Sequence, residues 1–82
     1  MNQIKIGKFI QLLRKDKNLT QAELANRIGV SDRAISKWEN GRGLPDYEYI
    51  SDLCDELGIT LMNLLLEKKS KVKIQKLNLK KT

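Results

Sequence analysis

The 82-residue sequence contains no histidine, a single cysteine and a single proline. A lone thiol, that of Cys54, cannot close an internal disulfide, and without histidine it has no partners for a metal-ligand cluster. The absence of histidine also removes the side chain that most often serves as a general base in catalysis. We therefore expect no metal, no other cofactor and no enzymatic activity.

Long hydrophobic runs are absent as well. The longest apolar stretch, Leu61 to Leu66, is interrupted by Asn63 and is far too short to span a bilayer. Apolar residues near the N-terminus are interleaved with charged ones, unlike the continuous apolar block of a secretory signal. A hydrophobic content of 40% beside 32% charged residues is typical of one small soluble domain. We expect a cytoplasmic protein that does not contact membranes.

The formal net charge of +6 is unevenly distributed along the chain. Residues 1–45 hold nine lysines and arginines against four acids, whereas residues 46–66 hold five acids and no basic residue. From residue 67 onward there are seven lysines and one acid. The folded part is thus basic at one end and acidic at the other, as expected of a protein that turns one face toward DNA.

Apolar residues recur at intervals of three and four, which is typical of helices, and no strand-like alternation precedes residue 70. The spacing predicts a first helix from about Ile4 to Lys17, whose early turns Gly7 weakens by about 1 kcal/mol relative to alanine. Pro45-Asp46 opens a fourth helix that ends at Gly58, and Thr60 caps a short fifth one. The apolar face expected for the fourth helix consists of Tyr47, Ile50, Leu53, Cys54 and Leu57.

The second and third helices lie between these and carry clear end signals. Thr20 and Glu23 form a capping box at the start of the second helix, and Gly29 ends it. Ser31 caps a third helix that continues to Asn40. Together the five helices predict an all-α fold, a compact five-helix bundle formed by residues 1–66. A lysine-rich tail or linker, residues 67–82, follows it.

Two helices joined by a short turn that contains glycine form a helix-turn-helix. This geometry requires a small residue where the helices cross, here Ala25, a glycine in the turn, and apolar residues on the inner faces. Seven positions hold a suitable residue: Leu24, Ala25, Ile28, Gly29, Val30, Ile35 and Trp38. We interpret Trp38 as a core residue, since it lies on the inner face of its helix.

The segment LTQAELANRIGVSDRAISKWENGRGLPD, from Leu19 to Asp46, resembles the Cro/cI-type, or lambda-repressor-like, helix-turn-helix family. This family is also named after the xenobiotic-response element. The preceding IGKFIQLLRKDKN and the following LCDELGITLMNLL resemble its first, fourth and fifth helices, so the likeness covers residues 4–66. It implies a sequence-specific DNA-binding transcriptional regulator, most often a repressor that binds a palindromic operator as a dimer.

The resemblance also implies which residues contact double-stranded DNA. The third helix enters the major groove, where Arg33 and Lys37 can bond guanine and Asp32 can accept from cytosine. Ser36 faces outward beside them, so the expected base contacts are Asp32, Arg33, Ser36 and Lys37. The expected phosphate contacts come from helix starts and from the loop after the third helix. They are Gln21, Ser31, Asn40 and Arg42.

Three other features are interpreted as structural. The resemblance pairs Glu39 with Arg14, an ion pair that would hold the first helix against the third. Cys54 lies on the apolar face of an acidic helix, where an inert thiol in the core is expected. The acids of the fourth helix have no metal-like partner in the sequence and are expected to form a solvated face.

The C-terminal part suggests an interface. Leu61, Leu64 and Leu65 can serve the core of a monomer, which leaves Met62 and Leu66 exposed at one end. We expect Met62 and Leu66, together with Leu65, to form a homodimer interface. The alternating apolar residues of the tail are consistent either with a solvated basic tail or with a strand that pairs with a partner chain.

Two alternatives to a dimeric regulator remain open from the sequence. The chain can be a protein-interaction module, such as an antitoxin-like protein or an adaptor, that binds a protein partner through its C-terminal part. It can also be the DNA-binding part of a longer regulator, in which case the lysine-rich tail is a linker.

Overall fold

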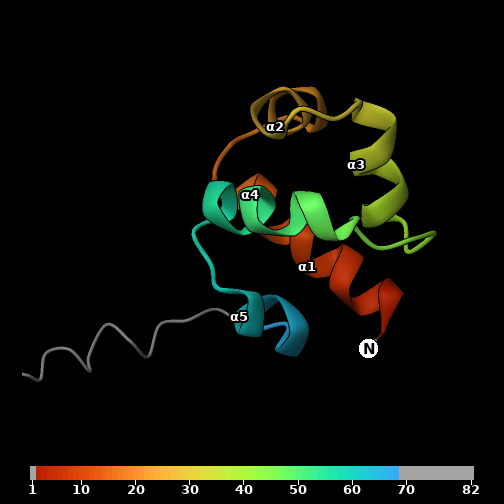
Figure 1. The fold of residues 1–82 in the computed structure, drawn as a ribbon, viewed down its shortest axis with the longest axis vertical. Helices are drawn as coiled ribbons and strands as arrows, with labels where there is room; N and C mark the ends of the chain where they lie inside the picture. Colours follow the sequence, from red (N-terminus) through yellow and green to blue (C-terminus); the bar gives the residue numbers. More distant parts are fainter. Residues whose placement is uncertain (1, 69–82) are drawn as a thin grey trace, which may run out of the picture.

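The computed structural model describes residues 2–68, which form five α-helices and no strand (Figure 1). This confirms the all-α prediction. The helices are α1 (Gln3–Asp16), α2 (Gln21–Ile28), α3 (Asp32–Glu39), α4 (Tyr47–Leu57) and α5 (Leu61–Leu66). None of them is both long and apolar enough to cross a membrane.

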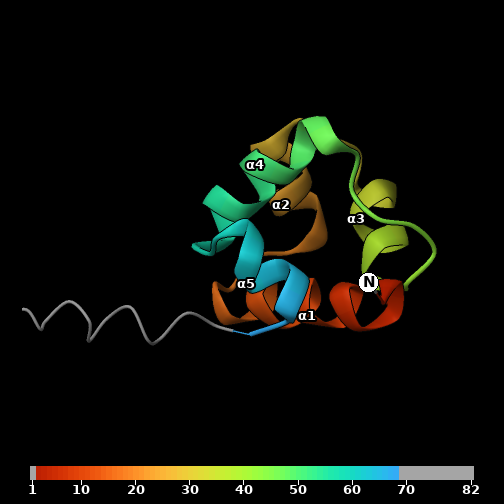
Figure 2. The ribbon, with the colours of Figure 1, turned by 60° about the horizontal axis from the view of Figure 1, so that its bottom comes forward.

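The long helix α1 is the base on which the other helices are assembled. It contacts α3, α4 and α5, while α2 contacts α3 and α4. Figure 2 shows α5 lying beside α1, and α4 contacts both of these helices. Every helix contributes to one core, which consists of Ile6, Phe9, Ile10, Leu13, Leu19, Leu24, Ala25, Ile28, Ile35, Trp38, Leu53, Cys54, Leu57 and Leu64.

Side-chain caps fix where the short helices begin. The Thr20 hydroxyl accepts from the Glu23 amide, and the Glu23 carboxylate accepts from the Thr20 amide, which completes the predicted capping box. Thr60 and Asn63 form a second capping box at the start of α5. Because short helices are marginal on their own, these bonds and the burial of one face together hold α2 and α5 in place.

Two sequence predictions about buried apolar residues were wrong. Tyr47, expected on the buried face of the fourth helix, is 91% exposed because it is the first residue of α4 and extends beyond the core. Of the three leucines of α5 assigned to the core, only Leu64 is buried, while Leu61 and Leu65 are exposed. A helix of six residues presents only one narrow face to α1 and α4, which leaves the rest of it uncovered.

Gly7 allows α1 and α3 to approach each other closely. A Cβ atom at this position would lie 2.1 Å from the carbonyl oxygen of Trp38 and 3.0 Å from that of Glu39. Both atoms belong to the backbone at the end of α3, so no side-chain movement relieves the clash. The sequence indicated only the weakening effect of glycine within a helix, whereas the structure shows that no larger residue fits there.

We expect Gly7→Ala to destabilise the fold. Helix propensity alone favours alanine by about 1 kcal/mol, but overpacking against a rigid backbone costs about 1–3 kcal/mol or more. Thermal unfolding followed by circular dichroism checks the sign, since 1 kcal/mol corresponds to about 4–8 °C in a domain of this size. Lys8→Ala, at the exposed neighbouring position, is the control and should change stability little. A higher melting temperature for Gly7→Ala would show that the two helices are not in such close contact.

The predictions for the tail fall outside the described residues, apart from Glu67 and Lys68. These two residues end α5: Glu67 has φ 55°, and the amide of Lys68 donates to the carbonyl oxygen of Asn63 at 3.0 Å. A bond of this span around a left-handed residue is a Schellman motif, which ends a helix and turns the chain away from its axis.

Candidate nucleic-acid interface

The helices α2 and α3 form the predicted helix-turn-helix. Gly29 adopts the left-handed conformation that ends α2, with φ 80°. Two residues later Ser31 caps α3, its hydroxyl oxygen accepting from the Ala34 amide at 3.2 Å. Ala25 is 3% exposed, as expected of the small residue at the helix crossing, and Val30 packs against the core from the turn. This packing fixes the direction of α3.

A buried ion pair joins α1 to the end of α3. The Arg14 guanidinium donates through Nε to Glu39 Oε2 at 2.6 Å and through Nη2 to Glu39 Oε1 at 2.9 Å. Its Nη1 donates to the carbonyl oxygen of Leu19 at 2.8 Å. The hydrogen bond to Glu39 raises the pKa of Arg14, against the opposing effect of burial. Such a two-point contact between a guanidinium and a carboxylate fixes both position and orientation.

Gln21 extends this network to the start of α2. Its Nε2 donates to Glu39 Oε1 at 2.9 Å, so the carboxylate links the first residue of α2 to the last residue of α3. A primary amide has two hydrogens on its nitrogen, and only one is needed for this bond. The second hydrogen remains for an acceptor outside the protein, at a helix N-terminus where backbone amides already favour anions.

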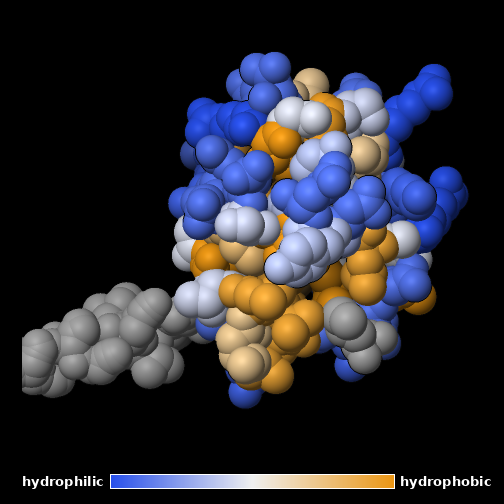
Figure 3. All heavy atoms as spheres, in the orientation of Figure 1, coloured by the Kyte–Doolittle hydropathy of each residue, from blue (hydrophilic) through white to orange (hydrophobic). Residues whose placement is uncertain are grey.

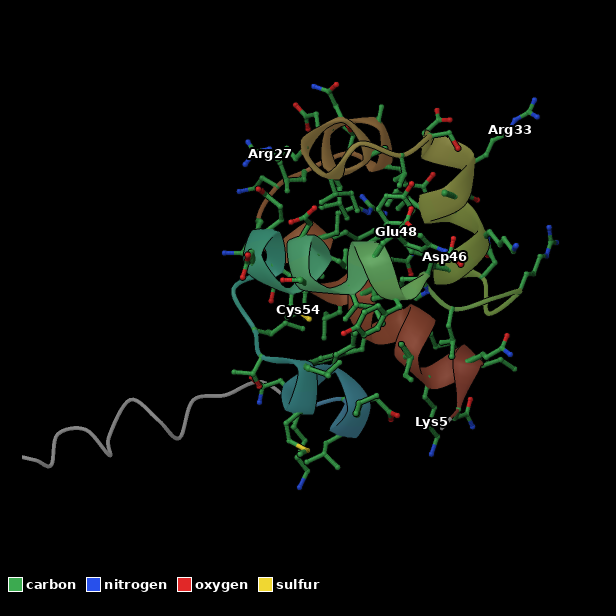
Figure 4. All side chains as sticks on the ribbon, in the orientation of Figure 1. Lys5, Arg27, Arg33, Asp46, Glu48 and Cys54 are labelled. Atoms are coloured by element: carbon green, nitrogen blue, oxygen red, sulfur yellow. The ribbon has the colours of Figure 1, made fainter. Side chains whose placement is uncertain are left out.

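The outward face of α3 carries the residues predicted to contact bases. Asp32, Arg33 and Lys37 are exposed and Ser36 is half-buried. Arg33, Ser36 and Lys37 line a hollow of about 370 Å³ together with Arg42 from the following loop. In Figure 4 the Arg33 side chain extends from α3 away from the body of the protein. Three cationic side chains therefore surround one concave surface.

The structure places the remaining predicted phosphate contacts close to α3, but not all of them have free donors. Asn40 Nδ2 donates to the carbonyl oxygen of Ser36 at 2.8 Å and lies 3.2 Å from its hydroxyl. Its side-chain donors thus serve the end of α3. The backbone amide of Arg42 donates to the carbonyl oxygen of Lys37 at 3.0 Å, which fixes the loop after α3. Arg42 itself is exposed.

The other titratable groups contribute no second site. Burial, and to a lesser degree the charge of Asp55, raises the pKa of the Cys54 thiol, which favours its protonated form at neutral pH. Glu56 of α4 forms an exposed ion pair with Arg27 of α2 at 3.3 Å, so this acid is not merely solvated. Within residues 2–68, no group of three or more histidine, cysteine or acidic side chains is placed to hold a metal ion.

Comparison with known proteins identifies the family to which this arrangement of helices belongs. Residues 10–64 match the sequence model of the helix-turn-helix family. The chain belongs to the helix-turn-helix family of Cro/cI-like DNA-binding regulators. The match runs from the middle of α1 to α5 and lies within residues 4–66, which resemble this family in sequence. Membership in this family identifies a DNA-binding regulator and not an enzyme.

Relatives of this helix-turn-helix chain have different roles in regulation. It is 45% identical over 56 residues to the HTH-type transcriptional activator BcrR of Enterococcus faecalis, covering 68% of this chain and 28% of BcrR. It is 36% identical over 64 residues to the antitoxin PezA of Streptococcus pneumoniae, covering 78% of this chain and 40% of PezA. The chain thus spans less than half of the length of either relative.

A solved structure supports the same assignment. The chain superimposes on the clp gene regulator ClgR of Corynebacterium glutamicum with a TM-score of 0.71 and 30% identity. The superposition covers 82% of this chain and 87% of the ClgR chain. The likeness therefore includes the fold as a whole and is not limited to the two helices of the motif.

Sequence reasoning missed two contacts that position the helices of the interface. The contact of Gln21 with Glu39 has no local signal, because the two residues are 18 positions apart. The close approach at Gly7 does have a local signal in the sequence, because a glycine inside an otherwise regular helix often marks a packing requirement.

We expect removal of Arg14 alone to destabilise the protein more than removal of both partners. Arg14→Met leaves the Glu39 carboxylate buried without its cation, which costs about 3–5 kcal/mol, whereas Arg14→Met with Glu39→Leu removes both charges. Chemical denaturation of the parent, both single variants and the double variant measures the coupling. Arg27→Met, which breaks the exposed pair with Glu56, is the control and should cost at most about 1 kcal/mol. Additive losses at Arg14 and Glu39 would contradict the coupling.

Proposed function

We propose that this protein is a sequence-specific transcriptional repressor that binds a palindromic operator as a symmetric dimer. The observation that carries the proposal is the cationic hollow formed by Arg33, Ser36, Lys37 and Arg42 on the outward face of α3. This helix is supported by α1 and α2 from behind. An α-helix with its side chains, about 10–12 Å across, fits the major groove of about 12 Å.

In this proposal the four side chains have different roles. Arg33 extends away from the body of the protein and bonds O6 and N7 of a guanine, while Asp32 accepts from a cytosine amino group. Lys37 and Ser36 contact the bases one turn later along α3. Arg42, Gln21 and Ser31 bind phosphates, which sets the register of α3 without reading sequence. Asn40 joins them only if its bonds to Ser36 open.

The dimer in this proposal is built on the exposed apolar surface of α5. Met62, Leu65 and Leu66 are between 37% and 60% exposed. Figure 3 shows hydrophobic residues gathered over α5, while the parts over α2 and α3 are mostly hydrophilic. Such a patch at one end of a small protein favours an interface. A two-fold axis through it presents two α3 helices to half-sites about 34–36 Å apart.

Repression requires nothing beyond this binding. A dimer that occupies an operator within a promoter excludes the polymerase sterically, without a further domain. Activation would require an additional contact with the transcription machinery, whereas repression requires only occupancy of the operator.

The antitoxin-like alternative rests on the similarity to PezA and on the same apolar surface of α5. A toxin partner would cover Met62 and Leu66 in place of a second copy of the chain. The two functions differ in the species present when the protein is purified by itself, since only the first requires a homodimer.

We expect Arg33→Ala to weaken binding to the best operator by about 1–3 kcal/mol and to relax the preference at one base position. Gln21→Ala is the matched control for a phosphate contact and should weaken binding to all sequences alike. Selection from random duplex DNA, followed by affinity measurement at several salt concentrations, distinguishes the two effects. If Arg33→Ala retained the affinity and the sequence preference of the parent, Arg33 would not be the residue that reads the base.

We expect Met62→Ser with Leu66→Ser to convert the full-length protein from a dimer to a monomer, because it removes the apolar side chains of one stripe of α5. Met62→Leu with Leu66→Met is the matched control, which keeps the apolar area and should stay dimeric. Sedimentation equilibrium at tens of micromolar, with and without a palindromic duplex, measures the oligomeric state. A parent protein that remains monomeric under both conditions would exclude the dimer.

A further inference from the structure

A groove between α4 and α5 lies apart from the residues assigned to DNA binding. It has a volume of about 570 Å³ and is lined on its apolar side by Tyr47, Ile50, Cys54, Ile59 and Leu61. Figure 4 shows Cys54 on the side of α4 that faces α5. Tyr47 at one end of the groove is 91% exposed, and Leu61 at the other is 48% exposed. The apolar walls of the groove are therefore open to solvent.

Acidic side chains accompany the apolar walls. Glu48 and Asp55 both line the groove, and α4 carries no basic residue. An occupant that matches this surface needs apolar side chains on one side and positive charge next to them.

The chain itself contains such a segment, Lys71-Val72-Lys73-Ile74. In an extended chain successive side chains point in opposite directions. Val72 and Ile74 then share one side, and Lys71 and Lys73 share the other. Long lysine side chains can bend toward nearby carboxylates while their stems cover apolar surface.

The distance from the end of α5 to the groove is within reach of this segment. The left-handed Glu67 and the bond from the Lys68 amide to Asn63 turn the chain away from the axis of α5. Val72 lies four positions after Lys68, a distance of at most about 14 Å along an extended chain. A helix of six residues is about 9 Å long, so the segment can return along α5 to Leu61 at its start.

We propose that residues 71–74 bind in the α4–α5 groove of their own chain, with Val72 and Ile74 against Tyr47, Ile50 and Leu61 and with Lys71 and Lys73 near Glu48 and Asp55. A segment on a short tether meets its site at an effective concentration of the order of millimolar. This favours the groove of the same chain over that of a second copy at micromolar protein. The inference does not depend on DNA binding, and it leaves Met62 and Leu66 on the neighbouring stripe of α5 free for the dimer.

Disulfide trapping in the full-length protein tests the proposal. Cys54 is the only cysteine of the chain and lines the groove, so Ile74→Cys creates a single possible internal pair with it, and the oxidation is run at alkaline pH, where the thiolate forms. Lys73→Cys, whose side chain points the other way, is the matched control. Because a disulfide requires a narrow range of Cα–Cα distances, Ile74→Cys should oxidise several-fold faster than Lys73→Cys. Its product should have the mobility of a monomer, at a rate independent of protein concentration.

Two further measurements complete the test, one on variants that lack the acidic charges and one on the unmodified protein. Adding Glu48→Gln and Asp55→Asn to Ile74→Cys should slow the oxidation, whereas Asp52→Asn, outside the groove lining, should not. In the unmodified protein, nuclear Overhauser contacts should join the Ile74 methyl groups to the Tyr47 ring within one molecule of a mixed labelled and unlabelled sample. Equal rates at positions 73 and 74, a cross-linked dimer, or contacts seen only between molecules would overturn the proposal.

Discussion

The buried contact between Arg14 and Glu39 is the interaction on which the rest of the structure depends. Through it, α1 is attached to the end of α3, and through Gln21 the start of α2 is attached to the same carboxylate. The third donor of Arg14 binds the carbonyl of Leu19, in the segment that connects α1 to α2. Four parts of the chain therefore meet at one ion pair, with no buried side-chain polar atom left unpaired within residues 2–68.

This arrangement explains how an acid is tolerated beside the face proposed to meet DNA. An unpaired carboxylate at the end of α3 would repel phosphates, but Glu39 is buried and its charge is balanced by Arg14. The pair is thus more important for geometry than for net stability, because the desolvation of two charges offsets much of their attraction. Its function is to hold the start of α2 and the end of α3 in one fixed relation.

The surface of the molecule has a cationic, an acidic and an apolar region, and the first two follow the uneven distribution of charge along the sequence. Cationic residues surround the hollow at α3, whereas α4 is acidic and α5 exposes apolar side chains. The three kinds of surface lie on different helices, so one small core supports contacts of different chemistry. The apolar surface exists because α5 is too short to bury more than one face. Its exposed residues Met62, Leu65 and Leu66 are therefore available for a partner.

The sequence alone determined the class of fold, the ends of the helices and the family, because these depend on local properties. Capping residues such as Thr20 and Ser31 act within one turn, Gly29 acts through its own backbone, and the spacing of apolar residues records which face is buried. The residues of α3 expected to contact bases followed from the family resemblance, and the inner-face positions of Ile35 and Trp38 agree with it.

Only the tertiary structure decided the features that depend on distances between segments far apart in the chain. The requirement for glycine at position 7 comes from the backbone of α3, more than thirty residues away. The bond of Gln21 to Glu39 likewise joins residues that no local pattern relates. The exposure of Tyr47, Leu61 and Leu65 was predicted wrongly, because periodicity gives the face of a helix but not how far its neighbours extend along it. That extent is set by the lengths and crossing positions of the packed helices, which no short stretch of sequence contains.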